Sequence, residues 1–316
     1  MLANARIIEI PFGLGGAVTG ADLGIEALKS VAKEAGSSLF DFNRKVEVAG
    51  YKKYEERSDK YAYIHYGDKV LRTILETSDM ILKVICNKRF PIVMAGDHST
   101  AAGTISGILR AFPKERLGVV WIDAHADLHS PYTSPSGNAH GMSLAMATGT
   151  DNEKRKRRTL DDMTLSLWNA LKDVSNKGGG LDIKDIVYVG GRAFEVEEMA
   201  LVEEHGNRNF TVDDIGGRKI EDIILEILQC LDHCQKIYVS FDVDSIDPSY
   251  SSGTGTPVAG GLSFEQVYRI NELLVSNDKV CCWEMVEINP LLDNNNRMAR
   301  GCFEIIQNIF NIVNNR

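Results

Sequence analysis

Short apolar runs alternate along the chain with longer stretches in which apolar residues recur every three or four positions. The short runs are rich in β-branched residues and predict strands, whereas the longer amphipathic stretches predict helices. The expected strands are Arg6–Ile10, Phe90–Ala95, Gly118–Asp123, Asp185–Gly190, Lys236–Asp242 and Lys279–Val286. The expected helices are Gly24–Ala35, Asp68–Asn87, Ser99–Phe112, Ile220–His233, Ser263–Ser276 and Met298–Val313. Apolar strands separated by helices predict an α/β fold with a parallel sheet covered on both faces.

Two stretches interrupt this alternation. Residues 39–65 are polar and rich in Tyr and Lys, and we expect them to form an excursion before the second helix. Residues 151–158, with the sequence DNEKRKRR, are expected to be a solvated surface loop in preference to a nuclear-targeting or nucleic-acid patch. Because no repeat or low-complexity linker separates the elements, residues 1–316 are predicted to form a single domain.

Charge and composition exclude several classes of function. The net charge of −9 argues against nucleic acid as a partner, because phosphate binding needs a basic face, and is compatible with a small cationic substrate. No run approaches the roughly 18 apolar residues of a membrane helix. The first residues, MLANARIIEIPFG, predict a strand and a loop in preference to a signal peptide. A cytoplasmic location without membrane contact is therefore expected.

The cysteines show no disulfide pattern. None of them forms a CxxC pair, and reduced thiols are expected at Cys86, Cys230, Cys234, Cys281, Cys282 and Cys302. Cys230, His233 and Cys234 could form a metal knuckle, but the apolar spacing of the surrounding segment favours burial on a helix.

Three of the apolar runs end in polar residues that core packing does not explain. The polar residues are Asp97, His98 and Ser99 after the first run, Asp123, His125 and Asp127 after the second, and Asp242 and Asp244 after the third. Side chains at alternate positions of an extended chain point the same way. In an open parallel sheet the ligand site lies beyond the carboxyl ends of the strands. The three clusters are therefore expected to converge.

Convergence has an electrostatic consequence, because four carboxylates at contact distance need compensating positive charge. Two divalent cations would match Asp123, Asp127, Asp242 and Asp244, and His98 and His125 would complete the ligand set. A set of nitrogen and oxygen donors without thiolate fits Mn²⁺ better than structural zinc. A lone Asp-X-Asp is often only a helix cap or a turn, but three clusters after buried strands favour a binuclear site.

These segments resemble those of a known family. The segments are GDHS at 96–99, DAHADL at 123–128, SGNAHG at 136–141, SFDVDSIDP at 240–248, GTGTPVAGGLS at 253–263 and VEINP at 286–290. They are similar to the signature segments of arginases and agmatinases, the ureohydrolase family, and the similarity covers nearly the whole chain. The resemblance implies a three-layer α/β/α sandwich around a mostly parallel sheet, and a homotrimer or hexamer.

The resemblance also implies a metal arrangement and a reaction. One Mn²⁺ would be held by His98, Asp123, Asp127 and Asp242, and the other by His125, Asp123, Asp242 and Asp244, with Co²⁺ or Ni²⁺ as possible substitutes. A hydroxide bridging the two metals would attack the guanidinium carbon and release an amine and urea. The expected catalytic residues are the metal ligand Asp127, His140 as a proton shuttle and Glu287 as the partner of the guanidinium group.

The substrate residues point to L-arginine, which would give L-ornithine and urea. The positions matching the family's substrate contacts are His129, Ser136, Asn138, Glu195, Glu198 and Thr256. Two of them depart from the usual arginase pattern, which has Asn at position 129 and Asp at position 195. For Glu195 and Glu198 the solvated start of a helix is the alternative interpretation, and for Thr256 it is a turn.

Three other functions stay open at this point. The two departures favour another amidino hydrolase, such as an agmatinase, a guanidinobutyrase or a formimidoylglutamase. A catalytically silent relative that serves in binding or assembly would be expected to lose metal ligands, yet all six positions are filled. A deacetylase of a related fold would use one zinc and fewer acidic ligands.

Overall fold

The computed structural model describes residues 5–41, 44–45, 60–176 and 179–316. Within these residues one sheet of eight strands has the order β2-β1-β3-β8-β7-β4-β5-β6, and every neighbouring pair is parallel. The strands are β1 Ala5–Ile10, β2 Arg44–Lys45, β3 Phe90–Ala95, β4 Leu117–Ile122, β5 Ile186–Val189, β6 Asn209–Phe210, β7 Lys236–Asp242 and β8 Val280–Val286.

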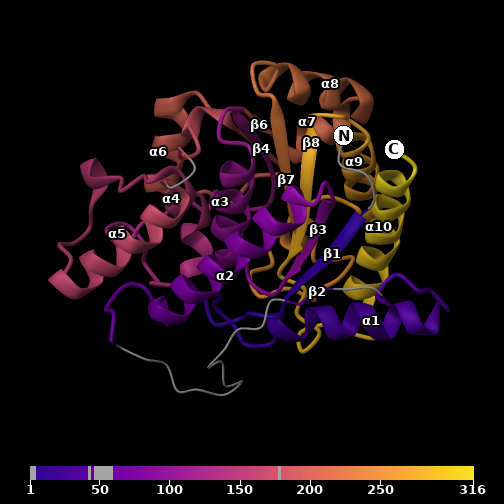
Figure 1. The fold of residues 1–316 in the computed structure, drawn as a ribbon, viewed down its shortest axis with the longest axis horizontal. Helices are drawn as coiled ribbons and strands as arrows, with labels where there is room; N and C mark the ends of the chain where they lie inside the picture. Colours follow the sequence, from indigo (N-terminus) through magenta and orange to yellow (C-terminus); the bar gives the residue numbers. More distant parts are fainter. Residues whose placement is uncertain (1–4, 42–43, 46–59, 177–178) are drawn as a thin grey trace.

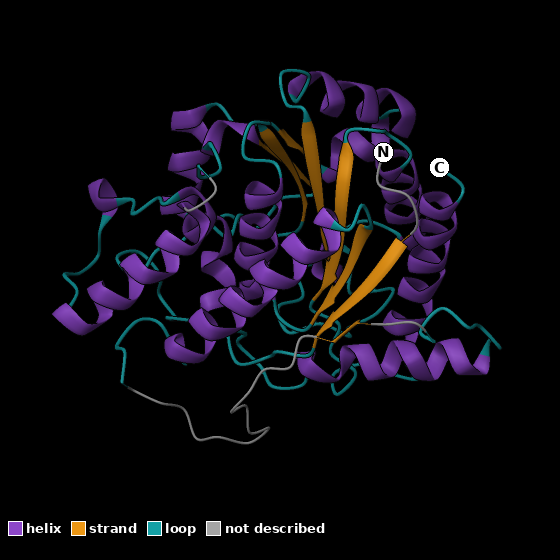
Figure 2. Ribbon diagram, viewed as in Figure 1, coloured by secondary structure: helices purple, strands orange, loops and turns teal. Residues whose placement is uncertain are grey.

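Helices cover both faces of this sheet (Figures 1 and 2). They are α1 Gly24–Glu34, α2 Gly67–Cys86, α3 Ala101–Ala111, α4 Ser143–Thr148, α5 Asp162–Asn176, α6 Val196–His205, α7 Val212–Gly217, α8 Ile220–Cys230, α9 Phe264–Val275 and α10 Arg297–Asn314. One group, α2 to α5, packs on one face, and α1, α8, α9 and α10 pack together on the other. The structure confirms the predicted three-layer α/β/α fold.

The two apolar cores follow from the alternation of side chains along the strands. In β4, Val119 and Trp121 belong to the core beneath α2, α3 and α5, while Val120 and Ile122 belong to the core beneath α8, α9 and α10. All residues of β3, β4 and β8 are buried, as expected for strands covered on both faces.

The six predicted strands and six predicted helices are present, with ends that differ by up to three residues. The largest difference at a helix start is in α3, where Asp97 caps a short 3-10 turn, η2 (His98–Thr100), before the α-helix begins at Ala101. The elements that the sequence did not predict are short helices, the longer helix α5 and the two-residue edge strands β2 and β6. A two-residue strand has no hydrophobic period from which it could be recognised.

The strand order places the site. Strands β3, β8, β7 and β4 are neighbours in the middle of the sheet, so their carboxyl ends bring the predicted polar clusters to one edge. Two further turns continue from these ends: η6 (Val243–Ser245) follows β7 directly, and η3 (Ala139–Met142) ends the loop after β4.

Of the predictions on the surface segments, one is confirmed and one needs correction. The segment 151–158 lies at the surface with several exposed side chains, although four of them also pair with α6 or with the turn at residues 131–134. Cys230 is exposed at the end of α8, although Cys234 is buried as expected. Most of the predicted excursion at 39–65 lies outside the described residues. Of the helices that are described, none has the length and apolar character needed to cross a membrane.

Candidate metal centre

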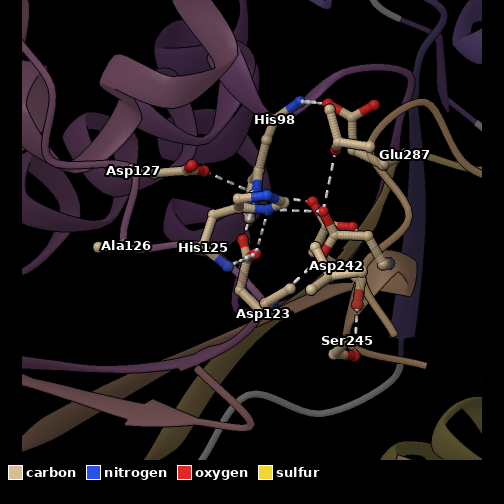
Figure 3. A network of polar contacts seen from close by, with 12 residues as sticks. His98, Asp123, His125, Ala126, Asp127, Asp242, Ser245 and Glu287 are labelled. Carbon is tan, nitrogen blue, oxygen red and sulfur yellow. Dashed lines mark hydrogen bonds and ion pairs between the residues drawn. The ribbon is translucent and has the colours of Figure 1, made fainter. Parts of the chain in front are cut away.

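The six predicted metal ligands meet at the carboxyl ends of β3, β4 and β7 (Figure 3). His98 opens the turn after β3, Asp123 directly follows β4, and Asp242 is the last residue of β7. The carboxylates and His98 are almost fully buried, and His125 is partly exposed. The side chains converge as expected, but turns at the strand ends and not strand alternation bring them together: His125 follows in a bend, Asp127 has a positive φ of 50°, and Asp244 lies in the 3-10 turn η6.

Three carboxylate oxygens surround one nitrogen of His98. Its Nδ1 lies 3.1 Å from Asp123 Oδ2, 3.2 Å from Asp127 Oδ2 and 3.1 Å from Asp242 Oδ2. The second group is centred on His125, whose Nδ1 lies 2.9 Å from Asp244 Oδ2 and 3.5 Å from Asp123 Oδ1. Asp123 belongs to both groups, with one oxygen facing each histidine.

The ring of His98 is held from two sides. Its Nε2 lies 2.8 Å from Ser240 Oγ on β7, and the ring stacks on Trp121 at a centroid distance of 4.0 Å. With Nε2 donating to the serine hydroxyl, the lone pair of Nδ1 points into the ring of carboxylates.

Burial and mutual repulsion make the ionised carboxylates costly. Burial raises the pKa of Asp127 to about 7, and the negative charge of Asp123 adds to the effect. Burial followed by the charges of neighbouring aspartates also raises the pKa of Asp242 and of Asp244. For His125 burial lowers the pKa, but the charge of Asp244 and contacts with Asp123 outweigh it and raise the pKa to about 12.

The donor groups fit divalent cations. Within the described part of the chain, the buried His98 Nδ1 and Asp123 Oδ2 find no hydrogen-bond partner, although they face each other. Both the His98–Asp123–Asp127 group and the Asp123–His125–Asp244 group bring one ligand atom per residue within 4.8 Å of one another. A cation in the His98 group would satisfy atoms that the protein alone leaves without a partner.

His140 and Glu287 form a pair beside this centre. His140 Nδ1 lies 3.1 Å from Glu287 Oε1, which also accepts a hydrogen bond of 2.9 Å from the backbone N–H of His98. Burial lowers the pKa of His140, but the hydrogen bond and charge of Glu287 outweigh it and raise the pKa to about 9. Glu287 and Asp127 both have positive φ angles, 68° and 50°, which a non-glycine residue adopts only when its surroundings enforce it.

A cavity of about 240 Å³ opens onto the centre. We call the part lined by metal-ligand candidates and His140 the inner end of the cavity. The outer end is the part lined by the predicted substrate contacts His129, Ser136, Asn138, Glu195 and Glu198. Glu198 is buried and accepts hydrogen bonds from the backbone N–H groups of Leu128 and Glu195, at 3.0 Å each. Both residues lie at the start of α6, but the interpretation as a solvated helix start fits only the part-exposed Glu195, because Glu198 is buried.

Two predicted residues have contacts that the motifs did not foresee. The hydroxyl of Thr256 lines the cavity but donates to Asp244 Oδ2 at 3.1 Å, so it also supports a metal-ligand candidate. Glu287 Oε1 accepts hydrogen bonds from His140 and from the backbone N–H of His98.

Sequence reasoning missed several supporting residues. Asp97 is fully buried, and its carboxylate accepts hydrogen bonds from Gly15 N at 2.7 Å and Ser99 N at 2.9 Å. Its place beside His98 was visible, but its partner lies 82 positions earlier in the chain. Ser240 and Trp121 sit inside predicted strands, where side-chain chemistry gives no signal of a partner.

Comparison with known proteins agrees with this geometry. The chain is 30% identical to the arginase of Bacillus subtilis (strain 168) over 311 residues, which covers 96% of each protein. Its structure is similar to the crystal structure of Bacillus caldovelox arginase, with a TM-score of 0.81, 27% identity and 98% of each chain covered. It is also similar to Entamoeba histolytica arginase solved with L-ornithine, with a TM-score of 0.80, 26% identity and coverage of 98% and 99%.

The model of one protein family matches residues 3–311, which is nearly the full length. The match confirms the resemblance carried by the GDHS, DAHADL and SFDVDSIDP segments, and with it the predicted enzyme class of arginase-like hydrolases. The chain belongs to the arginase family.

Proposed function

We propose that this protein is a binuclear metal hydrolase that converts L-arginine to L-ornithine and urea. The observation that carries the proposal is the shared carboxylate of Asp123, whose two oxygens face His98 and His125, beneath a cavity that His125 and other metal-ligand candidates line. We infer that His98, Asp123, Asp127 and Asp242 hold one ion, and that His125, Asp123, Asp242 and Asp244 hold the other.

The donor set favours Mn²⁺, with Co²⁺ or Ni²⁺ as substitutes, because it combines imidazole and carboxylate and contains no thiolate. When bound, such a metal pair supplies positive charge and activates water as a nucleophile at neutral pH. The protein's own contribution is a buried, prearranged set of ligands in which Ser240 orients His98.

The residues beside the centre suit the remaining steps. His140 lines the cavity, and its raised pKa of about 9 keeps it protonated at neutral pH, so it can donate a proton to the departing amine. Glu287 Oε1 accepts from His140 and orients it, and we propose that Oε2 pairs with the guanidinium group of the substrate.

L-Arginine is supported by the family and by the outer end of the cavity. Carboxylates of Glu195 and Glu198 suit an α-ammonium group, while Ser136 and Asn138 offer hydrogen bonds to a carboxylate. The similar arginase of Entamoeba histolytica was solved with L-ornithine, the amino acid that this reaction would release.

One observation favours a second candidate, an amidino hydrolase for a substrate without an α-ammonium group, such as 4-guanidinobutyrate. His129 Nε2 lies 3.6 Å from both Glu195 Oε2 and Glu198 Oε2, where it competes with a substrate ammonium and alters the outer end. The contacts of His129 leave the proposed metal ligands unchanged. The two proposed enzymes therefore differ only in their substrate.

A substrate panel tests the proposal. Protein loaded with Mn²⁺, Co²⁺ or Ni²⁺ is assayed with L-arginine, agmatine, 4-guanidinobutyrate and N-formimino-L-glutamate, and metal-free protein is the control. We expect urea release from L-arginine with the highest kcat/KM and with Mn²⁺. A higher kcat/KM for agmatine would replace arginase by agmatinase, and no turnover of any compound would overturn the hydrolase.

We further propose that residues 1–316 act as one domain, that the chain assembles as a trimer or hexamer, and that it works in the cytoplasm. The six cysteines are free, which suits a reducing compartment. Analytical ultracentrifugation tests the assembly, and a single cooperative unfolding transition tests the domain.

A further inference from the structure

The basic segment Lys154–Arg158 packs against α6 and the loop at residues 131–134, next to the outer end of the cavity. Lys154 and Arg155 pair with Glu204 near the end of α6, at 2.5 and 3.2 Å. Arg158 donates to the carbonyl oxygens of Pro131 and Ser134, at 3.0 and 2.5 Å, on the loop that continues to Ser136. The segment thus ties together α6 and the loop that form two sides of the cavity.

Arg157 contacts the first turn of α6. Its Nε and Nη2 donate to the two carboxylate oxygens of Glu197 at 2.6 and 2.8 Å, which is a bidentate pair. Its backbone N–H donates to Tyr132 O at 2.9 Å, so the main chain is fixed as well. From this position Nη2 also reaches Glu195 Oε2 at 3.4 Å.

Glu195 Oε2 therefore lies between two nitrogen groups. Arg157 Nη2 is 3.4 Å away on the solvent side, and His129 Nε2 is 3.6 Å away on the cavity side. His129 is buried, its Nδ1 lies 3.1 Å from Thr133 Oγ1, and its Nε2 has no hydrogen-bond partner within the described ranges. Glu195 also lines the cavity. Its carboxylate therefore interacts both with Arg157 and with a ligand bound in the cavity.

The neighbouring carboxylate of Glu198 differs in this respect. Backbone N–H groups of Leu128 and Glu195 fix both of its oxygens, and its side chain is only 4% exposed. Glu195 also belongs to the capping box of α6, in which its side chain faces the backbone N–H of Glu198, but the side chain is 43% exposed. Of the two carboxylates at the outer end, Glu195 is the one whose attraction for a substrate ammonium group can be reduced by Arg157.

We propose that Arg157 is a specificity-determining positioning residue, which compensates the charge of Glu195 and weakens the hold of this carboxylate on the α-ammonium group of the substrate. The inference rests on the proposed function. It assigns a role to the basic segment, which acts on substrate choice through Glu195 without touching the substrate.

The test is Arg157→Gln, which removes the charge and keeps a polar side chain. It is assayed with L-arginine and with 5-guanidinopentanoate, which is L-arginine without its α-amino group. We expect KM for L-arginine to fall by about two- to five-fold, the effect of a half-exposed ion pair. The values of kcat and of KM for 5-guanidinopentanoate should stay unchanged, because only binding of the ammonium group is affected.

Three variants separate this role from a structural one. Arg155→Gln lies on the same segment but pairs with Glu204, so it should change neither KM. Arg157→Lys keeps the charge and should retain the wild-type KM values. In a Glu195→Gln background, Arg157→Gln should have no effect on L-arginine, because the carboxylate that it compensates is gone.

Calorimetric titration with L-ornithine and with 5-aminopentanoate, its analogue without the α-amino group, tests the same contact without turnover. If the Arg157→Gln variant binds L-ornithine more tightly and 5-aminopentanoate equally well, the inference is supported. This holds even if the wild type releases no urea, because the absence of urea release contradicts only the proposed function. Equal shifts for both ligands, no shift, or no binding of either ligand would overturn the inference.

Discussion

The two ends of the cavity are built in different ways. At the inner end, buried carboxylates and histidines follow directly from central strands, and the nitrogen–oxygen distances around His98 lie between 3.1 and 3.2 Å. At the outer end, His129, Glu195 and Arg157 come from a loop, a helix start and a surface segment, with contacts of 3.4 to 3.6 Å.

This difference separates chemistry from substrate choice. The sheet positions the metal-ligand candidates, since they lie in β7 or in turns that begin at the ends of central, fully buried strands. The outer end depends in part on the Arg157–Glu195 pair, which solvent reaches, and such pairs contribute little energy and are easily exchanged. Substitutions at the inner end should therefore affect turnover by orders of magnitude, and those at the outer end should affect KM by small factors.

The largest effect is expected for Asp123→Ala. The variant loses the one carboxylate that faces both histidines, so both ions should be lost and kcat/KM should fall by about 10³-fold or more. Metal content is measured by elemental analysis beside urea release, with Asp222→Ala on the exposed start of α8 as the control. Retention of both ions by Asp123→Ala would contradict the shared site.

His140→Ala should keep both ions and still lose activity. Its imidazole contacts Glu287 and not the metal-ligand candidates, so turnover should slow by about 10²- to 10⁴-fold, the effect of a lost acid–base group. Elemental analysis and kcat at pH 7 to 9 check this result. Metal loss as large as that of Asp123→Ala would remove the separate role of His140.

Ser240→Ala tests the support behind the inner end. Without the hydroxyl that contacts Nε2, the His98 ring loses its orientation, and manganese affinity should fall by about 10- to 100-fold. Titration of metal-free protein with Mn²⁺ gives the affinity. If affinity is unchanged, stacking on Trp121 alone is enough to orient the ring.

The smallest effect is expected at the outer end. His129→Asn removes the nitrogen that faces Glu195 and Glu198, so KM for L-arginine should fall by about two- to five-fold while kcat and metal content stay the same. A change in kcat or in bound metal would show that the two ends are not independent.

The same contrast explains what could be predicted from the sequence. The inner end was predictable because the polar residues follow the strands directly and parallel strands end at one edge, whereas the turns that orient His125 and Asp127 had no signal in the strand pattern. The resemblance to ureohydrolases then assigned the shared ligands, and the comparisons confirmed the family.

The outer end was less predictable because its contacts join distant parts of the chain. Arg157 and Glu197 are 40 positions apart, and no periodic pattern links a basic run to a helix that the sequence did not predict. The interpretation of the charge cluster as a solvated surface segment is confirmed, but its pairing with α6 follows only from the folded chain. Ser240 and Asp97 were missed for the same reason, since their partners lie 142 and 82 positions away.

The most direct test of the shared centre is electron paramagnetic resonance of the manganese-loaded protein, with the bound metal counted in the same sample. Two ions per chain with the spectrum of a spin-coupled pair are expected, because Asp123 places the two groups within reach of one carboxylate. One ion or fewer per chain, or two ions with the spectra of isolated Mn²⁺, would contradict the account.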